Sequence, residues 1–309
     1  MAANARYALV LAAGYGKRMG PLGHELAKPL WPVFGTTILG HLINQLLEKD
    51  FKKIFVNTHH LHQQVSNYLK THYPSVIILN EDPILDSGGA IINCAHHIGE
   101  TQGELYTFNG DNIIDLTNFN YSSAGDITLF SEEVPKESAY NRLVIEGGVL
   151  KKIMPYSEEA SLTSNLTYSG ISIFKLSSHV LKAKIVPRGI FKDMLNFERD
   201  QVHIQPFHGL QVDLGTREKY VEGLRFLLSQ AQVEDSSWVG FLKVFCLLKP
   251  ELINNQQMSY AAGSAEGTFN FGTRAYDGTV TGAIIFDDSW QQVMSHSLHF
   301  AGGTYPYGL

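Results

Sequence analysis

The sequence predicts an α/β fold in which a mostly parallel β-sheet is covered by helices on both faces. In residues 1–115, short apolar runs that end in Gly, Asn or Asp alternate with segments whose apolar residues recur at helical spacing. Strands that alternate with helices form parallel sheets joined by right-handed crossovers. The chain has 309 residues, of which 44% are hydrophobic, so it can bury a core in one large domain or in one domain plus a smaller one.

The first half of the chain supplies the alternating elements. Helices are predicted where apolar residues share one face, as Ile38, Leu42 and Leu46 do. These helices cover residues 37–50, 61–73 and 88–99. The strands are rich in Val, Ile, Leu, Phe and Tyr, and they cover residues 7–14, 52–60, 75–82 and 104–111.

The second half of the chain has a looser pattern, with glycine-containing turns that are typical of hairpins. Thr216 is the predicted N-cap of a strongly amphipathic helix. Predicted strands cover residues 126–134, 141–153, 167–176 and 201–215, and predicted helices cover 187–200, 216–232 and 236–252. We expect one domain over residues 1–229 and a C-terminal extension over 230–309, whose Gly-, Ser- and Thr-rich end keeps no repeat of fixed period.

Charge and composition narrow the range of functions. The formal net charge is −6, which does not support general nucleic-acid binding, so any anion site must be local. Cys94 and Cys246 are far apart and form neither a disulfide framework nor a metal-binding pattern. The apolar run from Tyr7 to Ala13 is too short to span a bilayer and lacks a cleavage pattern, so we expect a cytoplasmic protein without a membrane partner.

The loop LAAGYGKRMG follows directly on the first predicted strand. Ligands of parallel sheets gather at the carboxyl ends of strands, where glycines let the backbone approach phosphates and basic side chains supply charge. Gly14, Gly16 and Gly20 are spaced one residue wider than the dinucleotide-binding fingerprint, and the second strand ends in Asn57 rather than in Asp or Glu. A P-loop pattern is also absent. A phosphate-binding loop and an ordinary loop with solvated basic side chains remain as alternatives.

Three histidines follow the second predicted strand. His59, His60 and His62 lack the acidic or Cys companions that a metal site of this spacing needs. We therefore interpret them as loop residues near the mouth of a pocket.

A longer stretch of the sequence, residues 9–33, resembles the signature of the nucleotidyltransferases that make nucleoside-diphosphate sugars. That signature is approximately L-A-A/G-G-x-G-x-R-[LM]-x-P-L, followed after a spacer by K-P-L-x-P-[VI]. The matching residues are Leu11, Ala12, Ala13, Gly14, Gly16, Arg18, Met19, Pro21, Leu22, Lys28, Pro29, Leu30, Pro32 and Val33. The spacer departs from the family, because Gly23 and Ala27 stand where Thr and Pro are frequent.

Further segments extend the resemblance over residues 6–228. EDPILDSGGAI is similar to the family segment that lies against the base and ribose, and FNGD and LQVDLGTREKY are similar to the two segments that carry metal-binding aspartates. These aspartates would be Asp111 and Asp213. TYSGISIF and GLQVDLGT resemble most the branch that acts on N-acetylmuramate 1-phosphate or mannose 1-phosphate.

The resemblance implies a three-layer αβα sandwich with a Rossmann-like mixed sheet, the nucleotide-diphospho-sugar transferase fold. It also implies Mg²⁺-dependent transfer of a nucleoside monophosphate from an NTP, UTP or GTP, to a sugar 1-phosphate. Arg18 would hold the leaving phosphates and Lys28 the α-phosphate, whereas Asp111 and Asp213 would ligate Mg²⁺. Nucleotide contacts would come from Leu11, Ala12, Ala13, Gly14, Gly16, Gly88 and Gly89, and sugar contacts from Asn109, Gly148 and Gly170.

One family element is missing from the chain. Many members carry E-K-P after a hairpin, and its lysine binds the sugar phosphate, but here Met154 precedes Pro155. Two other functions stay open. One is a cytidylyltransferase for a phosphorylated alcohol such as phosphocholine, and the other is a catalytically weak regulatory homologue.

Overall fold

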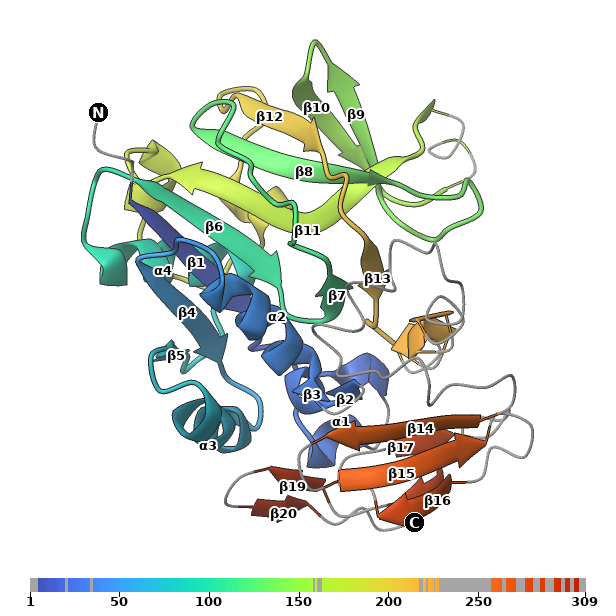
Figure 1. The fold of residues 1–309 in the computed structure, drawn as a ribbon. Helices are drawn as coiled ribbons and strands as arrows, with labels where there is room; N and C mark the ends of the chain where they lie inside the picture. The colour runs from blue at the N-terminus through green and yellow to red at the C-terminus, as the bar shows by residue number, and fades with distance from the viewer. Residues whose placement is uncertain are drawn as a thin grey trace.

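The structure is a computed structural model, and it describes most of the N-terminal part of the chain (Figure 1). The ranges are 5–19, 22–33, 36–157, 159, 163–216, 219–220, 222–224 and 226–227, followed by the strands named at the end of this subsection. The predicted helix over 236–252 lies outside these residues. The predicted division of the chain at residue 229 stays a prediction.

A nine-stranded mixed sheet forms the centre of the fold. The strand order is β5-β4-β1-β6-β11-β8-β12-β10-β9. The bounds are β1 (Arg6–Leu11), β4 (Lys53–Thr58), β5 (Ile77–Asn80), β6 (Glu104–Asn109), β8 (Ile127–Glu133), β9 (Arg142–Glu146), β10 (Val149–Met154), β11 (Leu166–Lys175) and β12 (Val202–Pro206).

The sheet has a parallel half and a half with mainly antiparallel pairs. Strands β5, β4, β1 and β6 run parallel. Strand β11 is antiparallel to both β6 and β8, so β8 and its parallel partner β12 run in the same direction as β1. Strands β10 and β9 complete the second half with antiparallel pairs. The loops after β1, β6, β8 and β12 therefore leave the same edge of the sheet.

Three helices cover the two faces of the sheet, as predicted. They are α2 (Ile38–Leu47), α3 (His62–His72) and α4 (Asp86–Ile98). Alternate residues of β1 point to opposite faces, so that Ala8 and Val10 join the core beneath α2 and α3, whereas Tyr7 and Leu9 join the core that contains α4. The predicted three-layer α/β architecture is thus confirmed.

Short elements connect this framework and shape its carboxyl edge. A separate pair of antiparallel strands, β7 and β13, lies at that edge. The short elements are η1 (Lys17–Met19), α1 (Leu22–Glu25), η2 (Lys28–Leu30), β2 (Pro32–Val33), β3 (Thr36–Thr37), β7 (Asn112–Ile114), η3 (His179–Lys182), η4 (Ile190–Met194) and β13 (Gln211–Asp213).

Two predicted elements of the second half are wrong. The predicted helix over 187–200 is only the turn η4, because the preceding backbone bonds to another element: Arg188 N donates to Leu85 O, and Arg188 O accepts from Gly88 N and Gly89 N. The single strand predicted over 201–215 is two strands, β12 and β13, which belong to different sheets. Tertiary pairing decides both outcomes.

The helix predicted after Thr216 is present in the described residues, which are helical at 219–220, 222–224 and 226–227. The Thr216 hydroxyl accepts a hydrogen bond from Lys219 N at 3.2 Å, which confirms the predicted N-cap. Tyr220 is buried and packs edge-on against Trp31, with ring centroids 5.1 Å apart. The helix is thereby anchored close to η2, which carries Lys28.

The C-terminal strands form small antiparallel groups. They are β14 (Gln257–Ala262), β15 (Ala265–Asn270), β16 (Tyr276–Thr279), β17 (Ile284–Phe286), β18 (Gln292–Ser295), β19 (Leu298–Phe300) and β20 (Gly303–Tyr305). Within the described part of the chain, every helix falls short of the length and apolar character needed to cross a bilayer.

Candidate active site

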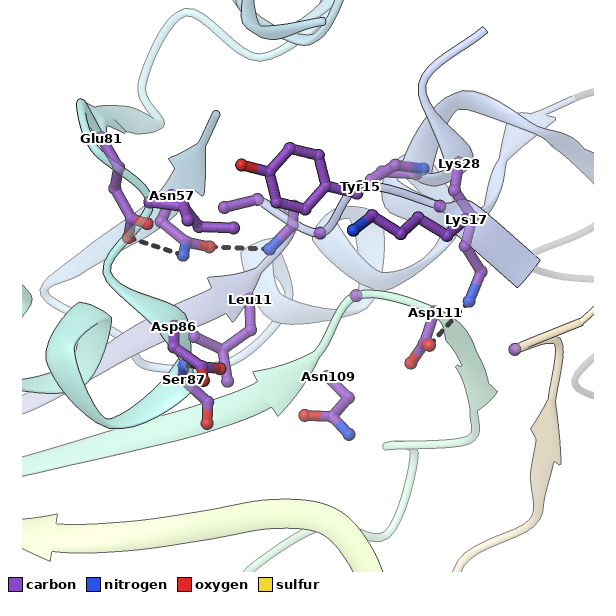
Figure 2. Close-up of a pocket in the computed structure, with 18 of the residues that line it drawn as sticks. Leu11, Tyr15, Lys17, Lys28, Asn57, Glu81, Asp86, Ser87, Asn109 and Asp111 are labelled. Atoms are coloured by element: carbon purple, nitrogen blue, oxygen red, sulfur yellow. Dashed lines mark hydrogen bonds and ion pairs between the residues drawn. The ribbon is translucent and has the colours of Figure 1, made fainter. Parts of the chain in front are cut away.

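A cleft of about 460 Å³ opens at the carboxyl ends of β1, β4 and β6 (Figure 2). One wall is the loop from Leu11 to Arg18, which we call the opening loop, and it includes all five residues predicted there to bind the nucleotide. Lys28, Ser87 and Asp111 are among the residues of the other walls. This position agrees with the rule that ligands of α/β sheets bind beyond the carboxyl ends of the strands.

A buried hydrogen-bond network fixes the shape of the cleft. Asn57 Oδ1 accepts from Ala12 N at 2.7 Å, and Asn57 Nδ2 donates to Glu81 Oε1 at 2.8 Å. Glu81 Oε2 accepts from Leu85 N at 2.9 Å. Burial raises the pKa of Glu81, and these donors oppose the shift. The network ties together the segments that follow β1, β4 and β5, as the dashed lines of Figure 2 show in part.

The opening loop brings basic side chains to the cleft. Gly16 has a φ of +62°, a conformation that favours glycine, and its Cα faces the Cβ of Lys28. The Lys28 ammonium lies 2.7 Å from Asp111 Oδ2, and Lys28 is only 8% exposed. Arg18 also lines the cleft. The structure therefore brings Asp111 into one cleft with Arg18 and Lys28, which come from a distant segment of the sequence.

The second predicted carboxylate lies beside the first. Asp213 ends β13, where it pairs with Asn112 of β7, and Leu214 N donates to Asp111 O at 3.1 Å. Arg18 reaches the same place, because a Cβ added to Gly215 would lie 3.5 Å from Arg18 Nη2. The two aspartates thus lie beside each other, with Lys28 bonded to Asp111 and Arg18 close to Gly215, two residues after Asp213.

Asp213 has a set of partners that the sequence did not indicate. Its Oδ2 accepts from Tyr140 Oη at 2.7 Å and from Lys219 Nζ at 2.5 Å. Burial works to raise the pKa of Asp213, but the bonds from Lys219 and Tyr140 outweigh it and lower the pKa. Nearby, burial and the charge of Asp213 raise the pKa of Glu132 to about 7.

The histidines after β4 hold the mouth of the cleft. His59 contacts Glu81 O through Nδ1 at 2.9 Å and the Tyr15 hydroxyl through Nε2 at 3.1 Å. His60 Nε2 lies 2.9 Å from Gly23 O. His59 thus contacts Tyr15 of the opening loop and His60 contacts Gly23 just beyond it, which agrees with their interpretation as residues of the pocket mouth.

One predicted sugar contact, Asn109, lines the cleft, and Gly170 makes room for it. Gly170 has a φ of +86°, and a Cβ added there would lie 2.7 Å from Asn109 Nδ2. The irregular register of β11 between Tyr168 and Ser172 creates this position. A larger residue than glycine at 170 would displace the Asn109 side chain.

The structure does not bring Gly148 to the cleft. It lies in the turn between β9 and β10, and β10 is separated from β1 by the four strands β6, β11, β8 and β12. At about 4.8 Å per strand step, the separation is roughly 20 Å or more, beyond the reach of a sugar whose phosphate meets Lys28. The turn itself requires glycine, because φ is +56° at Gly147 and +75° at Gly148.

Gly88 and Gly89 lie where the first turn of α4 packs against the segment around Arg188. Their backbone N–H groups donate to Arg188 O, and a Cβ on Gly89 would lie 2.5 Å from Val186 O. They allow α4 to pack closely against this segment, whereas the preceding residues Asp86 and Ser87 line the cleft. Asp86 and Ser87 therefore form part of the cleft wall, whereas Gly88 and Gly89 follow these lining residues in the sequence.

The chemistry of the carboxylates fits a magnesium ion that arrives with a nucleotide. Asp111, just before β7, and Asp213, at the end of β13, could supply hard oxygen ligands from neighbouring segments. Among the described residues, no group of three or more His, Cys, Asp and Glu side chains could hold a metal by itself. Mg²⁺ commonly binds one or two carboxylates together with substrate phosphates and water, so two aspartates are enough for that mode.

Sequence reasoning missed Asn57, Glu81, Tyr140 and Lys219 as parts of this site. Asn57 was considered only as evidence against a dinucleotide-binding motif, although its position at the end of β4 is itself a site signal. Tyr140 and Asp213 are 73 residues apart, and no local pattern connects them.

The fold is that of the nucleotide-diphospho-sugar transferases. HddC from Yersinia pseudotuberculosis superposes with a TM-score of 0.60 at 20% identity, covering 71% of this chain and 98% of HddC. CTP:phosphocholine cytidylyltransferase (LicC) from Streptococcus pneumoniae has a TM-score of 0.59 at 19% identity, covering 72% of this chain and 99% of that protein. At these identities the likeness establishes the fold.

The chain belongs to the nucleotidyl transferase family, whose sequence model matches residues 7–185. The bifunctional protein GlmU of Methanococcus maripaludis is 28% identical over 205 residues, which are 64% of this chain and 44% of that protein. The mannose-1-phosphate guanylyltransferase catalytic subunit beta of Drosophila melanogaster is 22% identical over 246 residues, 75% of this chain and 66% of that subunit. The chain thus spans about half to two thirds of the length of these relatives.

Proposed function

We propose that the protein transfers a nucleoside monophosphate from an NTP to a sugar 1-phosphate and releases pyrophosphate. The observation that carries this proposal is the Lys28–Asp111 ion pair in the cleft, with Asp213 on the segment bonded to Asp111 and Arg18 close to Gly215. Two polyanions must meet in such a reaction, so charge neutralisation and positioning dominate its catalysis. The site supplies both basic side chains and metal-ligating carboxylates.

The reaction needs no protein base. A phosphate oxygen of the sugar 1-phosphate attacks the α-phosphorus, the bond from that phosphorus to the α,β-bridging oxygen breaks, and pyrophosphate leaves with the electron pair. Lys28 would stabilise the charge on the α-phosphate, and Arg18 would bind the leaving phosphates through its paired N–H donors. Asp111 and Asp213 would hold Mg²⁺, which would supply further neutralisation of phosphate charge.

We infer that the nucleotide is UTP or GTP and that the acceptor is a sugar 1-phosphate such as mannose 1-phosphate, and a named relative supports GTP. The Drosophila relative is named a mannose-1-phosphate guanylyltransferase, and resemblance to that branch also appears in the motif around Asp213. The opening loop and the segment at Ser87, which line the cleft, would provide contacts to the base.

A second candidate is cytidylyl transfer to a phosphorylated alcohol. It is favoured by the similarity of fold to LicC, whose name specifies CTP and phosphocholine. The bond changes are the same, because a phosphate oxygen again attacks the α-phosphorus. The acceptor distinguishes the two candidates.

Pyrophosphate release tests both candidates in one experiment. The full chain is incubated with Mg²⁺, each of the four NTPs, and glucose 1-phosphate, mannose 1-phosphate, N-acetylglucosamine 1-phosphate, N-acetylmuramate 1-phosphate or phosphocholine. We expect release that depends on one NTP and on a sugar 1-phosphate, and that is lost in Asp111→Asn. Release only with CTP and phosphocholine would support the second candidate. A folded protein that releases no pyrophosphate with any pair would contradict both and favour a regulatory homologue.

A further inference from the structure

A second lysine–carboxylate pair lies at the margin of the cleft. Lys219 Nζ donates to Asp213 Oδ2 and to Tyr140 Oη, each at 2.5 Å, and its side chain is 34% exposed. Gly215 N donates to Asp213 Oδ1 at 2.6 Å, and Gly215 lines the cleft. The pair therefore adjoins the nucleotide cleft without belonging to its lining.

The two lysine–carboxylate pairs have matching arrangements. Lys28 bonds to Asp111, the residue immediately before β7, and Lys219 bonds to Asp213, the last residue of its partner strand β13. Lys28 belongs to η2 in the first half of the chain, whereas Lys219 follows the N-cap Thr216 of the helix after β13. The reaction proposed above joins two phosphates, so a site with one lysine for each phosphate matches its charge requirement.

The basic side chains that line the cleft are Lys17, Arg18 and Lys28, and all three precede α2. Arg18 and Lys28 would be engaged by the phosphates of the NTP, whereas the Lys17 ammonium lies over the Tyr15 ring, 5.0 Å from its centroid. An acceptor phosphate adds further negative charge at the same centre, and it needs a cation from another direction. Lys219 is the described lysine next to Asp213 that can supply it, since its flexible stem lets the ammonium move between oxygen partners.

We propose that Lys219, together with the Tyr140 hydroxyl, binds the phosphate of the sugar 1-phosphate. This inference rests on the proposed function and identifies the acceptor side of the same site. Lys219 offers a charge and Tyr140 a neutral donor, and the two already converge on one carboxylate oxygen, Asp213 Oδ2. A phosphate oxygen next to Asp213 would meet the same two donors.

A buried arginine holds Tyr140 in place. Arg142 is fully buried, and its Nη2 donates to the carbonyl groups of Pro135, Lys136 and Ser138 at 3.1, 3.0 and 2.9 Å. These bonds shape the loop between β8 and β9, which carries Tyr140 to Asp213. The position of the Tyr140 hydroxyl is therefore built into the fold before any substrate binds, which reduces the entropy lost on binding.

In the resulting step, Lys219 and Tyr140 hold one oxygen of the acceptor phosphate and leave another oxygen free to attack. That oxygen forms the bond to the α-phosphorus of the NTP, and pyrophosphate departs with the electrons of the broken bond. Neither Lys219 nor Tyr140 exchanges a proton in this step. Their effect is on affinity and orientation, so it should be seen mainly in the KM for the acceptor.

The test is steady-state kinetics of Lys219→Met in the full chain with Mg²⁺. We expect the KM for the sugar 1-phosphate to rise about 10- to 100-fold, as for a lost hydrogen bond to a charged group, while the KM for the NTP changes less than about threefold. Lys52→Met is the matched control, because Lys52 also forms a lysine–carboxylate pair, with Glu100 at 2.6 Å, but lies just before the amino end of β4, at the opposite end of the strand from the cleft. Both KM values should be unchanged in this control.

Tyr140→Phe gives an independent test if Lys219→Met fails to fold, because it removes only the hydroxyl. We expect a smaller rise, about 3- to 10-fold, in the same KM. Unchanged acceptor KM values in a folded Lys219→Met protein, or equal rises in both KM values, would show that the pair is only structural and would overturn the inference. A parent protein without activity toward any substrate pair would instead contradict the proposed function.

Discussion

The parallel half of the sheet and its second half build opposite sides of the site in different ways. In the parallel half, the loop after β1 and the turn after β6 carry Arg18, Lys28 and Asp111 in contiguous motifs. In the second half, Tyr140 follows β8 and Asp213 follows β12, and they meet across 73 residues of sequence. The nucleotide side is thus local in sequence, whereas the proposed acceptor side is assembled by long-range pairing.

The reason for the difference is the direction of the strands. Strands β8 and β12 run in the same direction as β1, so the segments after them leave the same edge as the opening loop. Between β8 and β12 the chain passes through β9, β10 and β11, and these strands form antiparallel pairs. A shared edge therefore brings these residues together without a shared motif.

The largest effect is expected at Asp111 and Asp213, the carboxylates that follow β6 in the parallel half and β12 in the second half. Asp111→Asn and Asp213→Asn each remove a charge that would bind Mg²⁺, so kcat should fall by about 10³-fold, as for the loss of several kcal/mol of electrostatic stabilisation. Steady-state rates at limiting and saturating Mg²⁺ measure this. A thermal melt serves as the folding control, and near-normal turnover of both variants at limiting Mg²⁺ would refute the two-carboxylate assignment.

The next effect concerns the opening loop alone. Arg18→Ala should lower kcat by about 10²-fold, and Arg18→Lys should stay impaired because a point charge cannot replace the paired guanidinium donors. Lys17→Ala is the matched control, since the Lys17 ammonium lies over the Tyr15 ring, 5.0 Å from its centroid. The control should keep most of its turnover. If Arg18→Ala reacts like the parent protein, the loop does not bind the leaving phosphates.

A third prediction concerns the second half of the sheet and the pH dependence of stability. Burial and Asp213 raise the pKa of Glu132 from 4.5 to about 7, so folding favours the protonated carboxyl group. Its contribution to stability is complete below pH 4.5 and is lost as the pH rises through about 7. Glu132→Gln stays neutral, so its free energy of unfolding should gain about 1–3 kcal/mol relative to the parent between pH 5 and pH 8.

Urea unfolding of both proteins across this pH range measures the difference. Glu146→Gln is a suitable control, because Glu146 is an exposed carboxylate at the end of β9. A pH-independent difference between Glu132→Gln and the parent would contradict the raised pKa of Glu132.

The smallest effect is expected at Gly148. Because Gly148 lies in the β9–β10 turn with a φ of +75°, Gly148→Ala should destabilise the fold by about 1 kcal/mol and leave the KM for the sugar 1-phosphate unchanged. Gly170→Ala is the informative comparison, because its Cβ would meet the Asn109 side chain in the cleft. A raised KM for the sugar 1-phosphate in Gly148→Ala would instead support the predicted contact between this glycine and the sugar.

The sequence predicted the parallel half of the fold well, because hydrophobic periodicity decides the type of a buried strand or amphipathic helix such as α2. It failed at residues 187–200, where the backbone of Arg188 bonds to α4 instead of continuing a helix. The residues of the opening loop that line the cleft could be predicted because they are contiguous in the sequence. The contacts of Tyr140 and Lys219 with Asp213 could not, because Tyr140 reaches Asp213 only in the folded chain. The distance between Gly148 and the cleft could not be predicted either, because a glycine motif does not report its position in a sheet.

The fate of the α-phosphate tests the central claim most directly. The protein is incubated with Mg²⁺, the sugar 1-phosphate that supports pyrophosphate release, and NTP labelled with ³²P at either the α- or the γ-phosphate. The account predicts that the α-label appears in the nucleoside-diphosphate sugar and the γ-label in pyrophosphate, in equal amounts. An α-label recovered as free nucleoside monophosphate, or a γ-label recovered as orthophosphate without added pyrophosphatase, would show hydrolysis instead of transfer and would contradict the account.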